Sequence, residues 1–225
     1  MYKEVVVINE KEHKSKGVKS LNHFLYAKDL NSCMITLDEF YESCKSYPIL
    51  FAKNDEGWFA LALFGLEDKN IFVNEDGEWK KDCYIPAYVR RYPFIYVKND
   101  NELLLGIDKT QLIKKTKTNK RYFFEKDSKQ SDFVKEVVKY LDAFQLQSIA
   151  TKNFIEKLEK LDILEPSTIK KTNKDKEEII GGFWVVSEDK LNNLKDEKKD
   201  LLCKDNSLKL ITAHLISLSN IKHIY

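Results

Sequence analysis

The chain contains 225 residues, of which 43% are hydrophobic and 33% are charged, and its formal net charge is +2. This apolar fraction is high enough to bury a core, which excludes a chain that is disordered throughout, and the length predicts one or two domains. A net charge near zero gives no global electrostatic reason to expect a nucleic acid or a membrane surface as partner. Only three of the 38 basic residues are arginines, namely Arg90, Arg91 and Arg121.

The sequence predicts a cytoplasmic protein. The apolar run from Val5 to Ile8 is much too short for the hydrophobic segment of a secretory signal, and no stretch approaches the ~18 apolar residues of a membrane span. The four cysteines form no C-x-x-C pair, and a domain of this size does not need disulfides, so we expect reduced thiols. The alternative is a cell-surface protein exported by a route that needs no signal peptide.

The first 64 residues predict a strand, a short helix and a hairpin. Thr36 can cap a helix whose first turn carries Asp38 and Glu39, the charges favoured at the positive end of the helix dipole. Pro48 forces the residue before it into extended geometry and so ends this helix. We expect a strand over residues 1–10, a helix from Leu37 to about Lys45, and strands over residues 49–52 and 58–64 around a turn at 53–57.

The same order of elements then recurs. The stretch from Tyr84 to Arg91 predicts a short helix with Pro86 near its first position, where a missing N–H costs little. Residues 47–55 and 92–100 are identical at five of nine positions, and the other four are all apolar or aromatic. The sequence therefore predicts two copies of a unit made of a helix, a Tyr-Pro pair and a hairpin. In the second copy the expected strands cover residues 94–97 and 103–107 around a turn at 98–101, and another hairpin turn is expected at 74–77.

The second half of the chain predicts mainly helix. Residues 109–121 carry six basic residues and no acidic one, which indicates a solvated loop, and we expect this basic loop to extend to residue 130. Ser131 can cap a long helix reaching about Asp162, with apolar residues spaced by three and four, and Pro166 is expected to end it. We further expect a charged connector over residues 170–178, a strand with a Gly-Gly bulge over 179–186, a helix capped by Ser187, and a deeply buried helix from Leu208 to about Lys222.

These elements predict an α+β fold, with an antiparallel sheet built from two Tyr-Pro hairpin units and packed against C-terminal helices. We expect a single domain over residues 1–225. It would comprise a β-rich half over residues 1–108, the basic loop over 109–130, and a mainly helical half with one Gly-Gly strand over 131–225.

The run from Tyr84 to Phe94, YIPAYVRRYPF, resembles the central motif of the bacterial SapC family. The likeness extends to Tyr47-Pro48-Ile49, to the Gly182-Phe183-Trp184-Val185-Val186 strand and to the terminal run from Ala213 to Asn220, in family order. The Lys-rich loop departs from the acidic, glycine-containing loop expected of the family. The resemblance implies a protein associated with surface-layer or cell-envelope biogenesis, and it supplies no reaction and no catalytic residue to carry over; we expect it to be non-enzymatic, to act by binding and to use no cofactor. A peptide-transport permease of the same name is a membrane protein and is excluded.

The adjacent pair Arg90-Arg91 is the strongest candidate site. A guanidinium fork beside aromatic side chains suits a carboxylate, a phosphate or an anionic sugar of the sialic acid type. The structural interpretation is preferred, because a basic residue at a helix C-terminus can cap carbonyls or pair with an internal carboxylate. Adjacent helical residues point about 100° apart and rarely both face one ligand, so one arginine is expected to be structural and the other exposed. The candidate ligand-binding residues are Arg90, Arg91, Tyr88, Tyr84 and Trp79.

The tryptophans and histidines offer weaker signals. Trp79, between two charged residues, is the better surface candidate for stacking on a sugar, whereas Trp58 and Trp184 lie in apolar segments and are expected in the core. His214 has apolar helical neighbours and is expected to be packed. The remaining candidates are not favoured, namely a zinc site at His13 and His23, a nucleophile made of Cys203 and His214, and nucleic-acid contact by residues 109–121.

Three hypotheses follow. The first is a SapC-like binding protein whose partner is an unknown protein or cell-surface component. The second is an enzyme or binding module for a small anionic or carbohydrate ligand held by Arg90 or Arg91. The third is a surface protein exported without a signal peptide. No G-x-S-x-G, P-loop, G-x-G-x-x-G or H-E-x-x-H motif occurs, so the sequence leans away from an enzyme and predicts neither a cofactor nor a metal.

Overall fold

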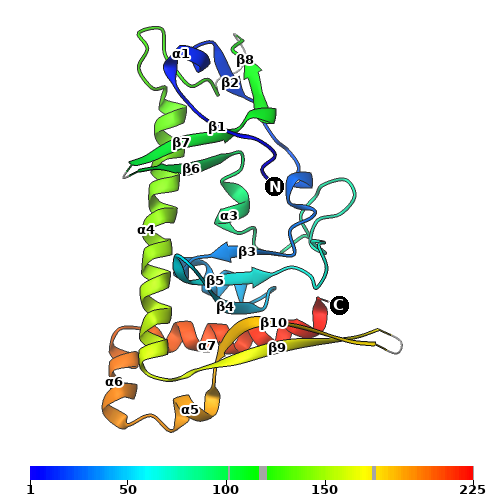
Figure 1. Cartoon of the computed structure of the whole chain (residues 1–225), viewed down its shortest axis with the longest axis vertical. Coiled ribbons are helices and arrows are strands. Elements are labelled where there is room, and N and C mark those ends of the chain that lie inside the picture. Colours follow the sequence, from blue (N-terminus) through cyan, green and yellow to red (C-terminus); the bar gives the residue numbers. More distant parts are fainter. Residues whose placement is uncertain (101, 117–120, 174–175, 225) are drawn as a thin grey trace.

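The computed structural model describes residues 1–100, 102–116, 121–173 and 176–224. Over residues 170–173 and 176–180 it describes the backbone only. The fold is α+β, with antiparallel sheets and helices, as predicted. The long helix α4 (Asp132–Lys160) runs along one side of an elongated molecule and passes both a smaller and a larger body of β structure (Figure 1).

The larger body is a five-stranded sheet in the order β3-β5-β4-β10-β9. Helix α7 packs beside β4 and β10, and β9 and β10 together extend as a long hairpin away from the body (Figure 1). The strands are β3 (Ser32–Ile35), β4 (Ile49–Asn54), β5 (Gly57–Leu63), β9 (Leu164–Asn173) and β10 (Lys176–Val186). The helices of this body are α2 (Phe40–Ser43), α5 (Glu188–Asn192), α6 (Asp196–Lys204) and α7 (Ser207–Ser217), with 3-10 helices over Leu37–Glu39 and Leu218–His223.

The smaller body is a three-stranded sheet in the order β1-β7-β6, accompanied by the two-stranded pair β2-β8. Its strands are β1 (Val5–Val7), β2 (Lys16–Val18), β6 (Phe94–Asn99), β7 (Glu102–Asp108) and β8 (Leu112–Lys114). Helix α1 (Glu10–His13) joins β1 to β2, and α3 (Ala87–Arg90) lies between the two bodies (Figure 1). Two further 3-10 helices cover Leu25–Ala27 and Lys109–Gln111.

The two Tyr-Pro hairpins have the same register but belong to different sheets. In the first, Ile49 pairs with Ala62, and in the second the equivalent residues Phe94 and Ile107 pair. The first hairpin is β4-β5 in the five-stranded sheet and the second is β6-β7 in the three-stranded one. The repeat therefore fixes the local structure of each hairpin without placing the two hairpins together.

Each body has its own hydrophobic core, and α4 contributes to both. Val134 and Leu141 belong to the core of the smaller body, whereas Phe154, Ile155 and Leu158 belong to that of the larger body. Apolar residues spaced by three and four on one helix face make this dual packing possible.

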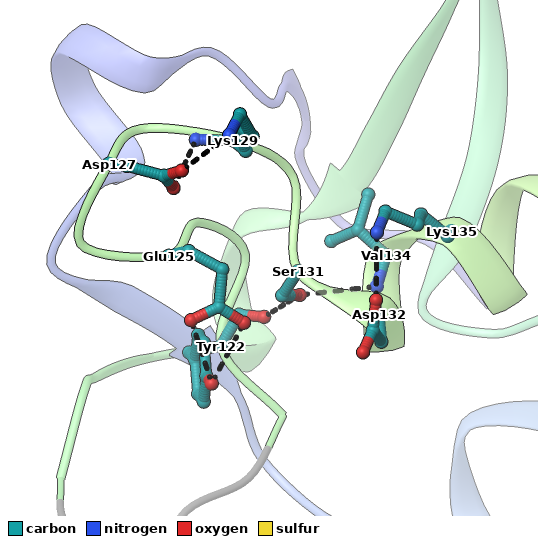
Figure 2. Close-up of polar contacts among 8 residues, drawn as sticks. All are labelled: Tyr122, Glu125, Asp127, Lys129, Ser131, Asp132, Val134 and Lys135. Carbon is teal, nitrogen blue, oxygen red and sulfur yellow. Dashed lines mark hydrogen bonds and ion pairs between the residues drawn. The ribbon is translucent and has the colours of Figure 1, made fainter.

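Ser131 begins α4, as predicted. Its hydroxyl accepts from the Val134 N–H at 3.3 Å and donates to the Tyr122 carbonyl. The Tyr122 hydroxyl donates to both oxygens of Glu125, at 3.0 and 3.1 Å. Figure 2 shows how the contact between Ser131 and the Tyr122 carbonyl fastens this segment to the start of the helix, where Asp132 also pairs with Lys135 at 2.8 Å.

Several boundaries differ from the sequence-based expectation. The basic segment after Asp108 is not a plain loop, because it forms a 3-10 turn and then β8, which pairs with β2; residues 117–120 lie outside the described residues. The expected connector over 170–178 belongs to the β9-β10 hairpin, apart from residues 174 and 175, which are not described. Helix α4 ends at Lys160, close to the predicted end, but Pro166 does not end it, because Asp162 already has a left-handed φ of 56° and Pro166 lies within β9. Helix α6 was not predicted, since its nine residues carry only two leucines and one cysteine among charged side chains.

The last helix is partly buried. Ile211, Ala213, His214 and Ser217 lie in the core, but Ile216 is 58% exposed. Among the described residues, no helix combines the length and the apolar character that crossing a membrane requires.

Candidate functional site

A buried carboxylate positions α3 between the two bodies. Glu39, 4% exposed, lies at the start of the first repeat unit and accepts from the Ala87 N–H at 2.7 Å and the Tyr84 hydroxyl at 3.1 Å. Its other oxygen accepts from the N–H and hydroxyl of Thr36, at 2.8 and 3.0 Å. Four donors compensate its burial, and they tie α3 of the second unit to the helical turn of the first.

Arg90 is held by the protein itself. Its Nε donates to the Ile85 carbonyl at 2.9 Å and its Nη2 donates to the Tyr84 hydroxyl at 2.9 Å. The guanidinium also lies over the rings of Tyr84 and Tyr140, 5.6 and 5.8 Å from their centroids. Burial, aided by the Glu39 carboxylate and opposed by Arg90, raises the pKa of Tyr84 to about 12, so this tyrosine is a neutral hydrogen-bonding link.

Arg91 is the less compensated of the two. Its guanidinium lies 4.1 Å from the centroid of the Tyr88 ring and 5.1 Å from that of Phe144. Its Nε is buried without a hydrogen-bond partner, and within the described part of the chain no acidic side chain forms an ion pair with it. Because a half-buried cation is costly without a nearby anion, this arrangement suits an anionic ligand.

A cavity of about 400 Å³ brings together all three arginines of the chain. Arg90 and Arg91 enter from α3 and Arg121 enters from the segment before α4, accompanied by Lys19 and by one acidic residue, Glu136. The rest of the wall is mostly apolar or aromatic: Val18, Leu21, Phe24, Tyr26, Tyr92, Pro93, Phe94, Phe133, Val137, Tyr140 and Leu141. We call this the first cavity. Both adjacent arginines line it, Arg90 bonded to the Ile85 carbonyl and the Tyr84 hydroxyl and Arg91 with an unpartnered Nε.

The sequence pattern does not predict Arg121 as a site residue. The pattern predicts a solvated loop there, yet the Arg121 backbone carbonyl accepts from the Val18 N–H at 2.9 Å, beside β2. The neighbouring Tyr122 carbonyl is fastened to Ser131 at the start of α4 (Figure 2). The signal that could have found it is the scarcity of arginine, since only three of the 38 basic residues are arginines and arginine differs from lysine in its planar, forked donors.

A second cavity, of about 340 Å³, lies on the other side of Arg91. Arg91 is the one residue that lines both this cavity and the first among the residues the structure describes. Its polar wall comes from the β4-β5 turn and from α4: Asn54, Glu56, Gln145, Ser148, Thr151 and Lys152. The turn itself requires Gly57, whose φ is 114°, and a Cβ there would lie 2.7 Å from the Lys152 side chain.

Trp79 does not belong to this site, and the expectation that it lies on the surface was wrong. It is only 9% exposed, and its Nε1 donates to the Tyr47 hydroxyl at 3.0 Å in the core of the larger body. Its charged neighbours in sequence face outward while the indole packs against Phe64. Trp58 is buried as predicted, and Trp184 is half-buried against its ring, 5.6 Å between centroids. Tyr84 and Tyr88 contact the arginines without lining either cavity.

His214 is packed, as predicted. It is fully buried, stacks on Phe51 at 4.5 Å, and its Nε2 accepts from the Val186 N–H at 3.0 Å. Burial lowers the pKa of His214 to about 4. Cys203 is exposed, so the buried imidazole does not form a nucleophilic pair with it. Within the described residues no three His, Cys, Asp or Glu side chains gather closely enough to hold a metal ion.

The SapC family model matches residues 8–224, nearly the whole chain. The chain belongs to the SapC family. No curated protein and no solved structure matches this SapC family member. The motif from Tyr84 to Phe94 that carries the resemblance is the segment that forms α3, both adjacent arginines and the start of β6.

Proposed function

We propose that this SapC family member is a non-enzymatic binding protein whose first cavity takes a small molecule with an anionic group and an apolar body. The observation that carries the proposal is the convergence of Arg90, Arg91 and Arg121 on one cavity with aromatic walls. Arginine forks bind carboxylates and phosphates in a bidentate manner, and aromatic faces accept an apolar body. A volume of about 400 Å³ is within the range of small-molecule sites.

The family resemblance supports the wider role. We propose that binding in this cavity serves surface-layer or cell-envelope biogenesis and that the protein acts in the cytoplasm. Fractionation of native cells tests this location: a cytoplasmic pool is expected, and a pool confined to the cell surface would overturn it.

Calorimetric titration with n-octyl phosphate, kept below its micellar concentration, tests the binding site. One site per chain is expected. Arg91→Met should weaken binding at least tenfold, because a charge-assisted hydrogen bond contributes roughly 1.5–3 kcal/mol. Glu136→Gln should strengthen binding, since it removes the one carboxylate in the wall described for the first cavity. Lys98→Met, an exposed position on β6 outside both cavities, is the matched control and should leave affinity unchanged.

Thermal unfolding and near-ultraviolet circular dichroism establish that each variant is folded. If folded Arg91→Met binds n-octyl phosphate as tightly as the wild type, or the wild type does not bind it, the proposal is wrong.

A further inference from the structure

One continuous face of helix α4 lines both cavities. Val137, Tyr140 and Leu141 line the first cavity, and Phe144, Ser148 and Lys152 line the second. Residues spaced by three and four lie on the same side of a helix, so the two cavities follow one another along α4. The element between them is the guanidinium of Arg91, which lies over Phe144.

The two cavities differ in chemistry. In the second, both hydrogen-bond donors and acceptors remain available: among the described residues, no partner is bonded to the Gln145 amide, the Glu56 carboxylate or the Asn54 Nδ2. Hydroxyl groups both donate and accept, so this wall fits a hydroxyl-rich group better than a second anion, which Glu56 would repel. The first cavity, in contrast, offers mainly aromatic and aliphatic surface beyond its cations.

We infer that the second cavity is a subsite for a hydroxyl-rich group of the same ligand. The ligand class is then an amphiphile in which a phosphate or carboxylate joins an apolar chain to a polar head. Its apolar part lies in the first cavity, its anion contacts Arg91, and its hydroxyl-rich head lies in the second cavity. This inference rests on the proposed function and extends it by naming the parts of the ligand and their order along α4.

A set of probes that share an eight-carbon chain tests the order. Octanoyl lysophosphatidylglycerol has chain, phosphate and hydroxyl-rich head, n-octyl phosphate lacks the head, and n-octyl glucoside lacks the anion. Inorganic phosphate represents the free anion. By calorimetry below micellar concentrations, the complete amphiphile should bind at least tenfold more tightly than each of the other three.

The variant Ser148→Phe tests the second cavity directly, because this half-buried α4 position lines it and a larger side chain would fill it. It should remove the advantage of lysophosphatidylglycerol over n-octyl phosphate and leave n-octyl phosphate binding unchanged. Ala143→Phe, an exposed α4 position that lines neither cavity, is the matched control and should change neither.

The outcomes separate the two claims. If n-octyl phosphate binds through Arg91 but the head group adds nothing, or Ser148→Phe has no effect, the second subsite is wrong while the proposed function stands. If Ser148→Phe weakens both probes equally, the subsite is also wrong. If inorganic phosphate binds as tightly as the amphiphile, the ligand is a free anion and the inference fails. If n-octyl phosphate does not bind at all, the proposed function itself fails.

Discussion

Leu63 and Asp108 occupy the same place in the two repeat units, and each donates its backbone N–H to the proline carbonyl of its own unit at 3.0 Å. The surroundings of the two units are quite different. Residues 49–52 of β4 are all buried, because β4 lies between β5 and β10 in the larger sheet. In β6, which is an edge strand, the equivalent residues after Phe94 are only half-buried.

The helical turns before the two prolines differ in the same sense. Lys45, the equivalent of Arg90, forms an exposed pair with Glu42 at 2.7 Å, and Ser46 stands where the second unit has Arg91. In the second unit both arginines line a cavity between the two bodies. One repeated local structure thus serves as the core of the larger body in its first copy and as the wall of a candidate binding site in its second.

The largest expected difference between the units is the free energy of unfolding that is lost when an aromatic side chain is truncated. Phe51→Ala should lower the free energy of unfolding by about 4 kcal/mol, because a fully buried aromatic ring is replaced by a cavity. Tyr96→Ala, at the equivalent position of β6, should cost about 1–2 kcal/mol, since the ring is half-buried and its hydroxyl bonds Asp142 at the surface. Urea unfolding measures both, and equal costs would contradict the difference in burial.

The first unit should also respond to pH through His214, which stacks on Phe51. Its folded pKa of about 4 lies below the ordinary value of about 6.5, so the unfolded chain binds the proton more readily. The stabilisation from the neutral imidazole is therefore present above pH 6.5 and is lost as pH falls toward 4. Between pH 7 and 4.5 the free energy of unfolding should fall by about 2–3 kcal/mol. His214→Gln should remove this part of the pH dependence in urea unfolding. An unchanged pH profile would show that the imidazole is not buried in its neutral form.

The stability of the second unit should depend on Asp108, whose equivalent in the first unit is Leu63. Asp108 is buried, and burial raises the pKa of its carboxyl, but donors from Lys3, Thr110 and Tyr92 outweigh this effect and lower the pKa overall. Asp108→Asn should cost about 2 kcal/mol at pH 7, because a carboxylate is replaced where several N–H and O–H groups donate.

The stabilisation from Asp108 is present above the unfolded pKa of about 3.9 and is lost as pH falls through the lower folded value. The gap between wild type and Asp108→Asn should therefore narrow on acidification below pH 4. A gap that widens there would contradict the assigned sign.

The smallest expected effect is the difference in stability between variants of the two adjacent arginines. Arg90→Lys should lower stability by about 1 kcal/mol, because lysine cannot bond the Ile85 carbonyl and the Tyr84 hydroxyl with one planar fork. Arg91→Lys should change stability by less than about 0.5 kcal/mol, since the Arg91 Nε has no partner to lose. Thermal unfolding of the two variants compares them, and equal shifts would show that the arginines are not divided into a structural and an available one.

Much of the local structure could be predicted because it depends on neighbours in sequence. Thr36 and Ser131 begin helical segments, and the Tyr-Pro repeat predicted two hairpins, whose common register came from the structure. The paired arginines could be predicted as a candidate site because their side chains carry forked donors and their neighbours in sequence are aromatic. The predicted placement of Trp79 was wrong because its charged neighbours show only that the adjacent side chains are solvated, whereas burial of the indole depends on Tyr47 and Phe64, which are distant in sequence.

By itself the sequence determined the α+β class, the duplicated unit and the scarcity of arginine, since these depend on composition, periodicity and turn chemistry. Only the tertiary structure decided that the two hairpins belong to separate sheets and that Arg121 meets Arg90 and Arg91 at one cavity. The physical reason is that α4 is long enough to serve two cores, and the space left between them is lined by whichever side chains α3 and the Tyr122 segment bring there.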